Sequence, residues 1–288
     1  MLLNTFTGNR NIKESLLGAL VSGRLSHGLL LCGEKGLGVN HFAWLLAADI
    51  IGATDIQPLK EGKNSQVISI KGEGAAGMIR VDKIRQLNED VSYSSIAGEK
   101  RVVIIHNCEN FNTNSANALL KNLEEPKNDT TYILTTNNPR AILATIRSRC
   151  RVYTLQRPSS AETAAYFAAH SADKAMVDSL MAIYGENIGK IKNAVSSEKR
   201  YAILQNAVAV FNMMKSKDTY GIVKACYIYA KAKDDFRLFL EDLRDICHRN
   251  LSPKNIQAIE TIHKYSEILT TNVNLNLALE NFAVEISR

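Results

Sequence analysis

The chain has few cysteines, and none of them stands in a C-x-x-C pair. Neither a four-cysteine zinc site nor a disulfide framework therefore has the spacing that it needs. We expect four of the five thiols to be small buried side chains in a reducing compartment, namely those of Cys32, Cys108, Cys226 and Cys247. The fifth, Cys150, lies in a motif described below. On this basis we predict no metal site.

Long apolar runs and dense blocks of one charge are also absent. No apolar run approaches the ~20 residues that a membrane-spanning helix needs. The first residues do not form a charged segment followed by an apolar one, as a secretory signal would. We therefore expect a cytoplasmic protein that does not enter a membrane. The net charge of +6 is spread along the chain, so it is weak support for nucleic-acid binding.

The residues that are present indicate an ordinary globular protein of two or three domains. The 288 residues are 45% hydrophobic and 22% charged. In the first half, short apolar runs alternate with longer amphipathic stretches, which predicts βαβ units on a parallel sheet. The expected strands are 27–32, 67–70, 101–105 and 130–136, and the expected helices are 41–50, 81–91 and 115–124.

The second half has a different pattern, in which strands disappear after residues 156–158. Helical spacing is found at 161–170, 174–184 and 200–214. A further stripe of apolar residues has helical spacing and predicts core packing; it comprises Phe236, Phe239, Leu240, Leu243, Ile246 and Cys247. We predict a sheet domain at 1–156, a helical lid at 157–206 and a helical collar domain at 207–288.

A glycine-rich turn between the first strand and the next helix resembles a phosphate-binding loop. Its working pattern is G-x-x-x-x-G-K-[ST], in which Lys reaches the β- and γ-phosphates and Ser or Thr holds Mg²⁺. Gly33, Gly36 and Gly38 supply the glycines, but Val39 and Asn40 stand where the lysine and the hydroxyl belong. The loop is therefore vestigial, and we expect no nucleotide or other cofactor to bind there.

The end of the strand at 101–105 lacks a second part of the ATPase machinery. An ATPase of this kind carries Asp-Glu there, for Mg²⁺ and for the attacking water. His106 and Asn107 follow instead, and neither is an anion. Loss of one such electrostatic contact commonly costs ~3–4 kcal/mol, so the chain is not expected to hydrolyse ATP. We interpret His106 as a strand-end histidine with satisfied hydrogen bonds, since no second ligand stands at metal spacing.

Three segments carry a family resemblance. They are SANALLKNLEEP at 115–126, ILTTNNP at 133–139 and TIRSRC at 145–150. Together they resemble bacterial DNA polymerase III clamp-loader subunits, which are AAA+ proteins. The match extends over about residues 6–195, and the degraded ATP site favours the delta-prime group of that family. The resemblance implies an AAA+ module of parallel sheet and helices, followed by the lid and the collar.

The resemblance also implies roles for particular residues. Arg149 matches the arginine of a Ser-Arg-Cys motif, which reaches the γ-phosphate bound by the adjacent motor subunit. It would act as an arginine finger in trans, with Ser148 and Cys150 supporting it. Thr136 and Lys190 match the two sensor positions, which would have no nucleotide to sense here. The flanking cations, Arg147 and Arg151, are expected to be solvated or to face DNA.

The partners implied are the delta and gamma/tau subunits, with the sliding clamp and primed DNA contacted through the complex. The chain would be a non-hydrolysing member of a hetero-oligomer that supports ATP-driven clamp loading during DNA replication. It would not be an enzyme by itself, and ATP would be bound by neighbouring subunits. Many delta-prime proteins insert a four-cysteine zinc module, but residues 51–78 contain no cysteine, so we expect no zinc.

Two other readings of the sequence remain open at this point. The first is an active AAA+ motor subunit, gamma/tau-like, with an unusual phosphate loop. The second, suggested only by the net charge, is a DNA-binding protein that acts alone.

Overall fold

The chain folds into two compact units, Met1–Tyr166 and Phe167–Arg288, and helix α7 (Ser160–Ala169) crosses the boundary between them. The computed structural model describes residues 1–74, 77–93, 100–127 and 129–287.

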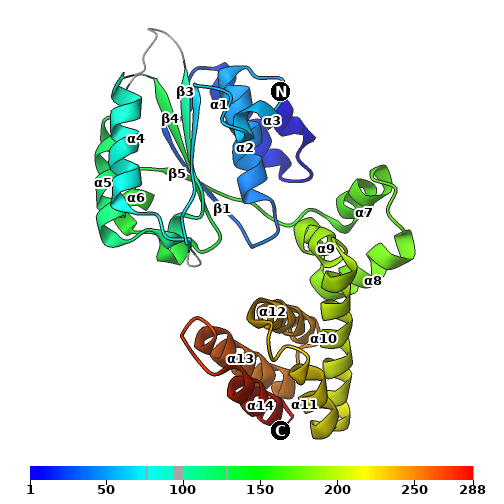
Figure 1. Ribbon diagram of the computed structural model, residues 1–288. Coiled ribbons are helices and arrows are strands. Elements are labelled where there is room, and N and C mark those ends of the chain that lie inside the picture. Colours follow the sequence, from blue (N-terminus) through cyan, green and yellow to red (C-terminus); the bar gives the residue numbers. More distant parts are fainter. Residues whose placement is uncertain (75–76, 94–99, 128, 288) are drawn as a thin grey trace. The chain divides into compact units, whose positions relative to one another are not determined.

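The first unit contains a five-stranded parallel sheet in the order β2-β3-β4-β1-β5 (Figure 1). The strands are β1 (Gly28–Cys32), β2 (Val67–Ile70), β3 (Arg101–Ile105), β4 (Thr130–Thr136) and β5 (Arg151–Thr154). The four predicted strands are confirmed, the first beginning one residue later than expected. The sequence did not predict β5, because this edge strand buries only Tyr153 and has no continuous apolar run.

The two faces of the sheet bury two separate cores. Leu29 and Leu31 of β1 pack with one cluster, whereas Leu30 and Cys32 pack with the other. Adjacent residues of a strand point to opposite faces, so a continuous apolar strand is the pattern expected when helices cover both faces. The β-branched run of β3 is divided between the two cores in the same way.

Helices cover both faces of this sheet (Figure 1). One face carries α1 (Arg10–Val21), α2 (Val39–Ile51) and α3 (Gln57–Lys60), and the other carries α4 (Val81–Tyr93), α5 (Thr113–Glu124) and α6 (Ala144–Arg147). Short 3-10 turns lie at Leu2–Thr5, Cys108–Asn110 and Pro139–Ala141. Helix α5 begins two residues before the predicted start, because the Asn112 side chain accepts a hydrogen bond from the Ser115 amide and caps it.

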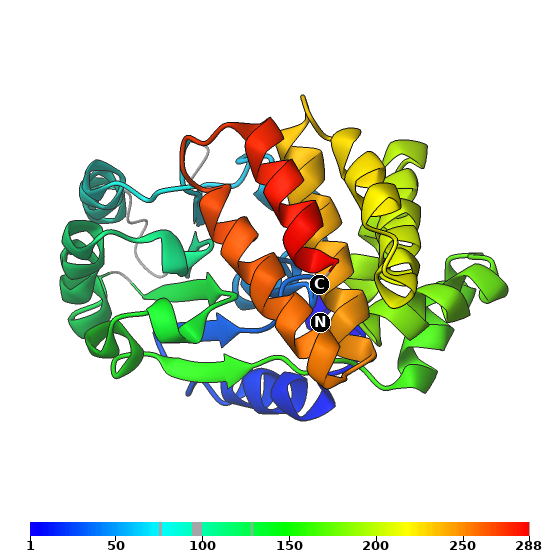
Figure 2. The same ribbon diagram turned by 90° about the horizontal axis from the view of Figure 1, so that it is seen from below.

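The second unit is helical in every described element, as predicted. Its helices are α8 (Lys174–Tyr184), α9 (Ile188–Ala194), α10 (Glu198–Ser216), α11 (Thr219–Tyr227), α12 (Lys233–Arg249), α13 (Pro253–Ile268) and α14 (Leu275–Ile286). Figure 2 shows α12, α13 and α14 packed side by side. The apolar stripe of α12 faces their shared core, where Phe236, Phe239 and Phe282 form ring contacts.

The boundaries of the proposed lid and collar stay predictions. Residue 206 lies inside α10, which continues without a break from Glu198 to Ser216. The first turn of this helix contributes Arg200 to a polar centre shared with α8 and α12, and its second half contributes Val210 and Met214 to the core of the unit.

All five cysteines are buried and unpaired, as expected for the four assigned to cores. Among the described residues, no group of three or more His, Cys, Asp or Glu side chains is placed to hold a metal ion. No helix in the described part of the chain is long and apolar enough to cross a membrane.

Candidate functional site

The glycine-rich loop that the sequence predicts to be a vestigial phosphate loop follows the carboxyl end of β1 and leads into α2. Gly38 caps α2 with a left-handed backbone (φ 77°), which favours glycine. A Cβ on Gly33 would lie 2.8 Å from Cγ2 of Val39, so the loop folds tightly over this valine. The Val39 side chain is itself buried in the core on the α2 face of the sheet. The position that holds the lysine in a working loop is therefore occupied by a core residue.

Uncharged side chains occupy the place where Mg²⁺ ligands would stand. The Asn40 Oδ1 accepts a hydrogen bond from the Thr135 hydroxyl at 2.6 Å and lies 3.0 Å from Nδ1 of His106. The Thr135 Oγ1 also accepts from the Asn107 amide at 3.1 Å, and Nε2 of His106 lies 3.1 Å from the Ser69 hydroxyl. The carboxyl ends of β2, β3 and β4 and the start of α2 are thus joined by neutral groups.

His106 is the titratable member of this network, and it is held neutral. Burial, with a smaller effect from the charge of Lys71, lowers the pKa of His106 to about 4. The neutral ring has one donor and one acceptor nitrogen. The partners assign the donor to Nδ1, which faces the amide oxygen of Asn40, and the acceptor to Nε2, which faces the hydroxyl of Ser69. The ring also packs against Trp44, with 5.6 Å between the ring centroids. His106 is a hydrogen-bonded strand-end residue here, as the sequence suggested.

This lowered pKa predicts a pH-dependent stability. The unfolded state binds a proton near pH 6.5 and the folded state only near pH 4, so stability is lost as the pH falls through this window. Between pH 7 and pH 4.5, we expect wild type to lose about 2–3 kcal/mol more unfolding free energy than His106→Gln does. Denaturant titrations followed by Trp44, the only tryptophan, would measure this. Equal losses in the two proteins would contradict the prediction.

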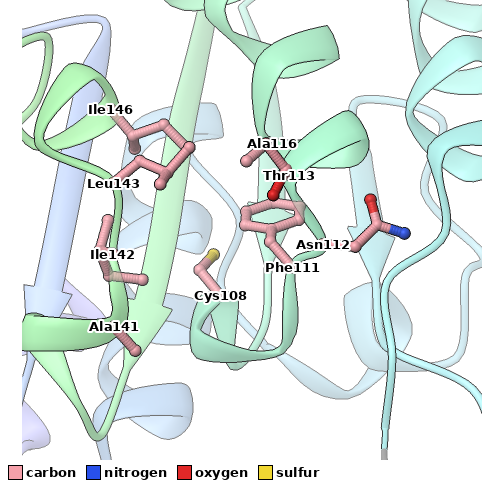
Figure 3. A pocket seen from close by; sticks show the side chains of 9 residues that line it. All are labelled: Cys108, Phe111, Asn112, Thr113, Ala116, Ala141, Ile142, Leu143 and Ile146. Carbon is pink, nitrogen blue, oxygen red and sulfur yellow. The ribbon is translucent and has the colours of Figure 1, made fainter.

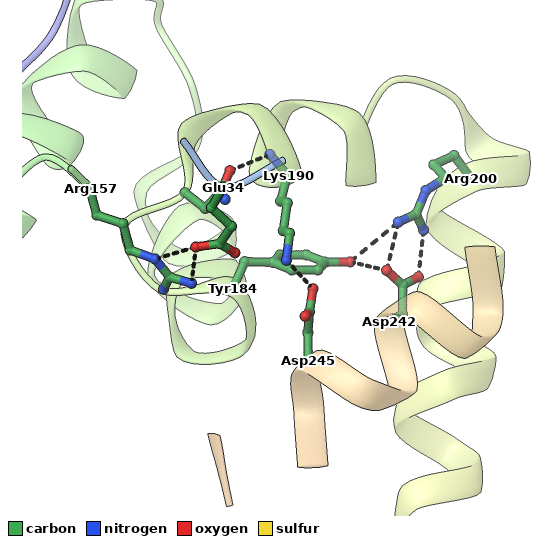
Figure 4. A network of polar contacts seen from close by, with 8 residues as sticks. Glu34, Arg157, Tyr184, Lys190, Arg200, Asp242 and Asp245 are labelled. Carbon is green, nitrogen blue, oxygen red and sulfur yellow. Dashed lines mark hydrogen bonds and ion pairs between the residues drawn. The ribbon is translucent and has the colours of Figure 1, made fainter. Parts of the chain in front are cut away.

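The segment that leaves β5 is fastened to the phosphate loop. Arg157 donates from Nε and one terminal nitrogen to the same Glu34 oxygen, at 2.9 and 2.7 Å (Figure 4). Asn9 and the backbone of Gln156 also exchange two hydrogen bonds. A pocket of about 470 Å³ lies beside this contact, between the ends of β1, β4 and β5. Hydrogen bonds within the protein thus join the phosphate loop, the segment at Asn9 and the segment that follows β5.

The predicted finger residue lies at the opposite end of β1. Helix α6 is anchored by the buried Ile146, and its C-terminal turn places Arg149 just before β5 begins. Cys150 is buried beside it, and burial raises the pKa of this thiol to about 12, which keeps it protonated and unreactive. A Cβ on Gly28, the first residue of β1, would lie 2.8 Å from the Arg149 carbonyl oxygen. The loop that carries Arg149 therefore packs directly on the amino end of β1.

The guanidinium of Arg149 has two close partners within the chain. One terminal nitrogen lies 2.5 Å from a carboxylate oxygen of Glu124, the last residue of α5. The other donates to the Thr145 carbonyl oxygen at 2.9 Å. The Arg149 side chain is 34% exposed, which leaves part of it open to a partner molecule. The flanking Arg147 and Arg151 are exposed.

A small pocket lies next to this helix. Its volume is about 230 Å³, and Phe111, Ile142, Leu143 and Ile146 supply apolar walls (Figure 3). The pocket separates the start of α5 from the segment that leads into α6. Ile146, which faces this pocket from α6, is also the buried residue that anchors the helix.

The two predicted sensor residues have structural partners. Thr136 is buried, and its hydroxyl accepts a hydrogen bond from the Asn138 amide at 3.0 Å. In the second unit, Lys190 forms an ion pair with Asp245 of α12 at 2.8 Å, and both side chains are more than four-fifths buried (Figure 4). Each residue thus has a protein group as partner.

Several residues of these sites were not singled out from the sequence. Thr135 and Ser69 join the neutral network through hydrogen bonds to residues at least 28 positions away. Glu124 lies within a motif segment, but its pairing with Arg149 depends on how α5 and α6 meet. No short-range pattern encodes such contacts, so only the fold identifies them.

Comparison with known families agrees with this geometry. A profile of the family described as DNA polymerase III, delta subunit, matches residues 8–159, which is more than half of the chain. The chain belongs to this family. The matched region contains the vestigial phosphate loop, the neutral network and Arg149, so both ends of β1 lie within it.

Curated relatives narrow the resemblance to clamp-loader proteins. The chain is 34% identical to DNA polymerase III subunit delta' of Pseudomonas aeruginosa over 154 residues, which are 50% of this chain and 47% of that protein. It is 30% identical to the tau subunit of Escherichia coli over 160 residues, or 52% of this chain and 24% of that one. The chain thus spans about half the length of the delta-prime relatives. These matches show a delta-prime-like clamp-loader protein of the AAA+ class.

The fold is shared more widely than the sequence. A gamma subunit-related protein from Thermotoga maritima superimposes over 95% of this chain and 99% of its own, with a TM-score of 0.59 and 18% identity. At this identity the likeness concerns the fold alone. It confirms the predicted fold class, a parallel sheet with flanking helices followed by a helical region.

Proposed function

We propose that this chain is a non-hydrolysing, delta-prime-type subunit of a bacterial DNA polymerase III clamp loader. In this role Arg149 completes the ATP site of a neighbouring motor subunit, and the complex loads the sliding clamp onto primed DNA. ATP is bound and hydrolysed by neighbours, so the chain is an accessory subunit of a hetero-oligomer and needs neither zinc nor nucleotide of its own.

The position of Arg149 carries this proposal. The arginine lies at the amino end of β1, and the chain's own phosphate loop begins after the carboxyl end of the same strand. The strand from Gly28 to Cys32 spans about 13 Å at ~3.3 Å per residue. A side chain at the amino end of β1 is therefore too far away to reach a phosphate bound at that loop. An exposed guanidinium on an anchored loop can instead contact a phosphate held by another subunit.

The neutral network supports the second half of the proposal. Hydrolysis needs a cation at the phosphates and anions for Mg²⁺ and water. Val39 is buried, Asn40 is hydrogen-bonded to Thr135, and His106 is held uncharged. The carboxyl edge of the sheet therefore supplies packing and hydrogen bonds where a motor subunit supplies charge.

Restoring the two phosphate-loop residues should not create an ATPase. In Val39→Lys with Asn40→Thr, His106 and Asn107 still provide no anion for Mg²⁺. The change also places an ammonium group at the buried Val39 position and removes a hydrogen-bonded amide, so we expect a loss of stability of at least about 1–3 kcal/mol rather than activity. ATP hydrolysis by the isolated variant and its thermal unfolding would be measured, with Asn40→Thr alone as the control. Steady-state turnover above the control would contradict the prediction.

The alternative is an active, gamma/tau-like motor subunit, because gamma and tau relatives match at nearly the same identity as the delta-prime ones. Fluorescent ATP binding to the isolated chain separates the two functions, and we expect no binding at millimolar nucleotide. Co-purification with the delta and gamma/tau subunits of the same cell tests membership of the complex. Failure to co-purify would overturn the proposed function.

A further inference from the structure

The contact between Arg149 and Glu124 joins two segments that are fixed on the same strand. The buried Leu123 anchors the end of α5, and its carbonyl oxygen lies 2.8 Å from Nε2 of His27, the residue before β1. The loop at Arg149 is held against Gly28 by close backbone contact. Because both backbones are packed on the start of β1, a change of partners would need to move only the two side chains.

Glu124 occupies one of the two terminal nitrogens that a phosphate would use, and the Thr145 carbonyl oxygen occupies the other. An arginine binds carboxylate and phosphate through the same planar fork of N–H donors. A γ-phosphate that approached Arg149 in this arrangement would meet the negative charge of Glu124, 2.5 Å from the guanidinium. The carboxylate and the phosphate therefore compete for the cation, and one of them must leave.

The exposure of this ion pair makes it easy to exchange. The Glu124 and Arg149 side chains are 47% and 34% exposed, and solvent-exposed ion pairs of this kind are weak. We propose that Glu124 is a positioning residue that holds Arg149 in a resting orientation and releases it when a neighbour presents its γ-phosphate. This inference rests on the proposed function of Arg149 and adds that Glu124 restrains the Arg149 side chain before the phosphate arrives.

Arginine labelling in the free chain tests the resting contact by itself. Phenylglyoxal reacts with accessible guanidinium groups, and mass spectrometry locates the product on each arginine. In Glu124→Gln we expect phenylglyoxal to modify Arg149 about two- to fivefold faster. This factor corresponds to the free energy that an exposed ion pair typically contributes. Arg147 should react at the wild-type rate. Glu125→Gln is the matched control, because Glu125 is the exposed neighbour of Glu124 in the sequence. An unchanged rate at Arg149 in Glu124→Gln would overturn the inference.

Turnover by the reconstituted complex tests the consequence. With delta, gamma/tau, clamp and primed DNA present, Glu124→Gln should raise kcat/KM for ATP at the adjoining site by about two- to fivefold. The gain should vanish in an Arg149→Ala background, which shows that Glu124 acts through Arg149. Two outcomes would overturn the inference and leave the proposed function intact. In the first, turnover falls in Glu124→Gln. In the second, turnover is unchanged in Glu124→Gln but clearly lower in Arg149→Ala. Wild-type turnover in Arg149→Ala overturns both.

Discussion

Replacing Arg149 with alanine is expected to depress the DNA- and clamp-stimulated ATPase of the whole complex while leaving assembly unchanged. A finger of this kind is worth ~10³–10⁵ in rate at its own site. Other motor sites keep their own fingers, so the loss in total turnover will be smaller than this factor. The side chain is partly exposed and its contacts are with Glu124 and Thr145, so its removal should cost the fold little.

Two further variants sharpen this test. Arg149→Lys should rescue turnover poorly, because an ammonium group cannot reproduce the planar two-pronged geometry of a guanidinium. Arg147→Ala is the matched control, since Arg147 is an exposed cation two residues away in the same segment. Steady-state ATP hydrolysis and clamp loading would be measured for each complex. Wild-type values with Arg149→Ala would mean that the subunit acts as a structural wedge.

Replacing Asp242 with asparagine is expected to destabilise the second unit by about 3–5 kcal/mol. Asp242 accepts two hydrogen bonds from Arg200, both at 2.7 Å, and one from the Tyr184 hydroxyl at 2.7 Å (Figure 4). Burial, and then the nearby carboxylate, raise the pKa of Tyr184, which keeps its hydroxyl protonated as a donor. The neutral amide would leave the buried Arg200 guanidinium without a counter-charge.

The measurement is chemical denaturation followed by far-ultraviolet circular dichroism. Asp234→Asn is the control, because Asp234 lies on the same helix with 90% of its side chain exposed, and we expect a change within about 0.5 kcal/mol. The triple variant Tyr184→Phe, Arg200→Met and Asp242→Leu should recover most of the loss, since apolar groups then replace both charges and the hydroxyl that donates to Asp242. A loss below about 1 kcal/mol with Asp242→Asn would contradict the large expected effect.

This polar centre also bears on how the second unit is divided. Tyr184 ends α8, within the predicted lid, whereas Asp242 lies on α12, within the predicted collar. Arg200 joins them from α10. Helices assigned to different domains therefore share buried charges, and breaking that contact should loosen both. Helical periodicity reports which face of each helix is buried but not which helices share a core, so the boundary at residue 206, which lies inside α10, stays a prediction.

The sequence by itself determined many of the elements and the candidate site residues. Short apolar or β-branched runs specified four strands, and 3.6-residue spacing specified seven helices, namely α2, α4, α5, α7, α8, α10 and α12, because burial recurs along the chain with the period of each element. Departures from the ATPase motifs were visible at Val39, Asn40, His106 and Asn107, since a motif is compared residue by residue. Arg149 was found in the same way, through its short motif.

Only the tertiary structure decided what these residues contact. It placed Arg149 and the phosphate loop at opposite ends of β1, and it paired Arg149 with Glu124. It also brought Asn40 to Thr135, which lies 95 positions away, and so joined the start of α2 to the carboxyl end of β4 through a neutral hydrogen bond. Such partners meet because parallel strands align their ends and helices cross at particular positions. The spacing of residues along the chain does not specify strand alignment or helix crossing. The packing of the whole unit therefore determines which of these residues are in contact.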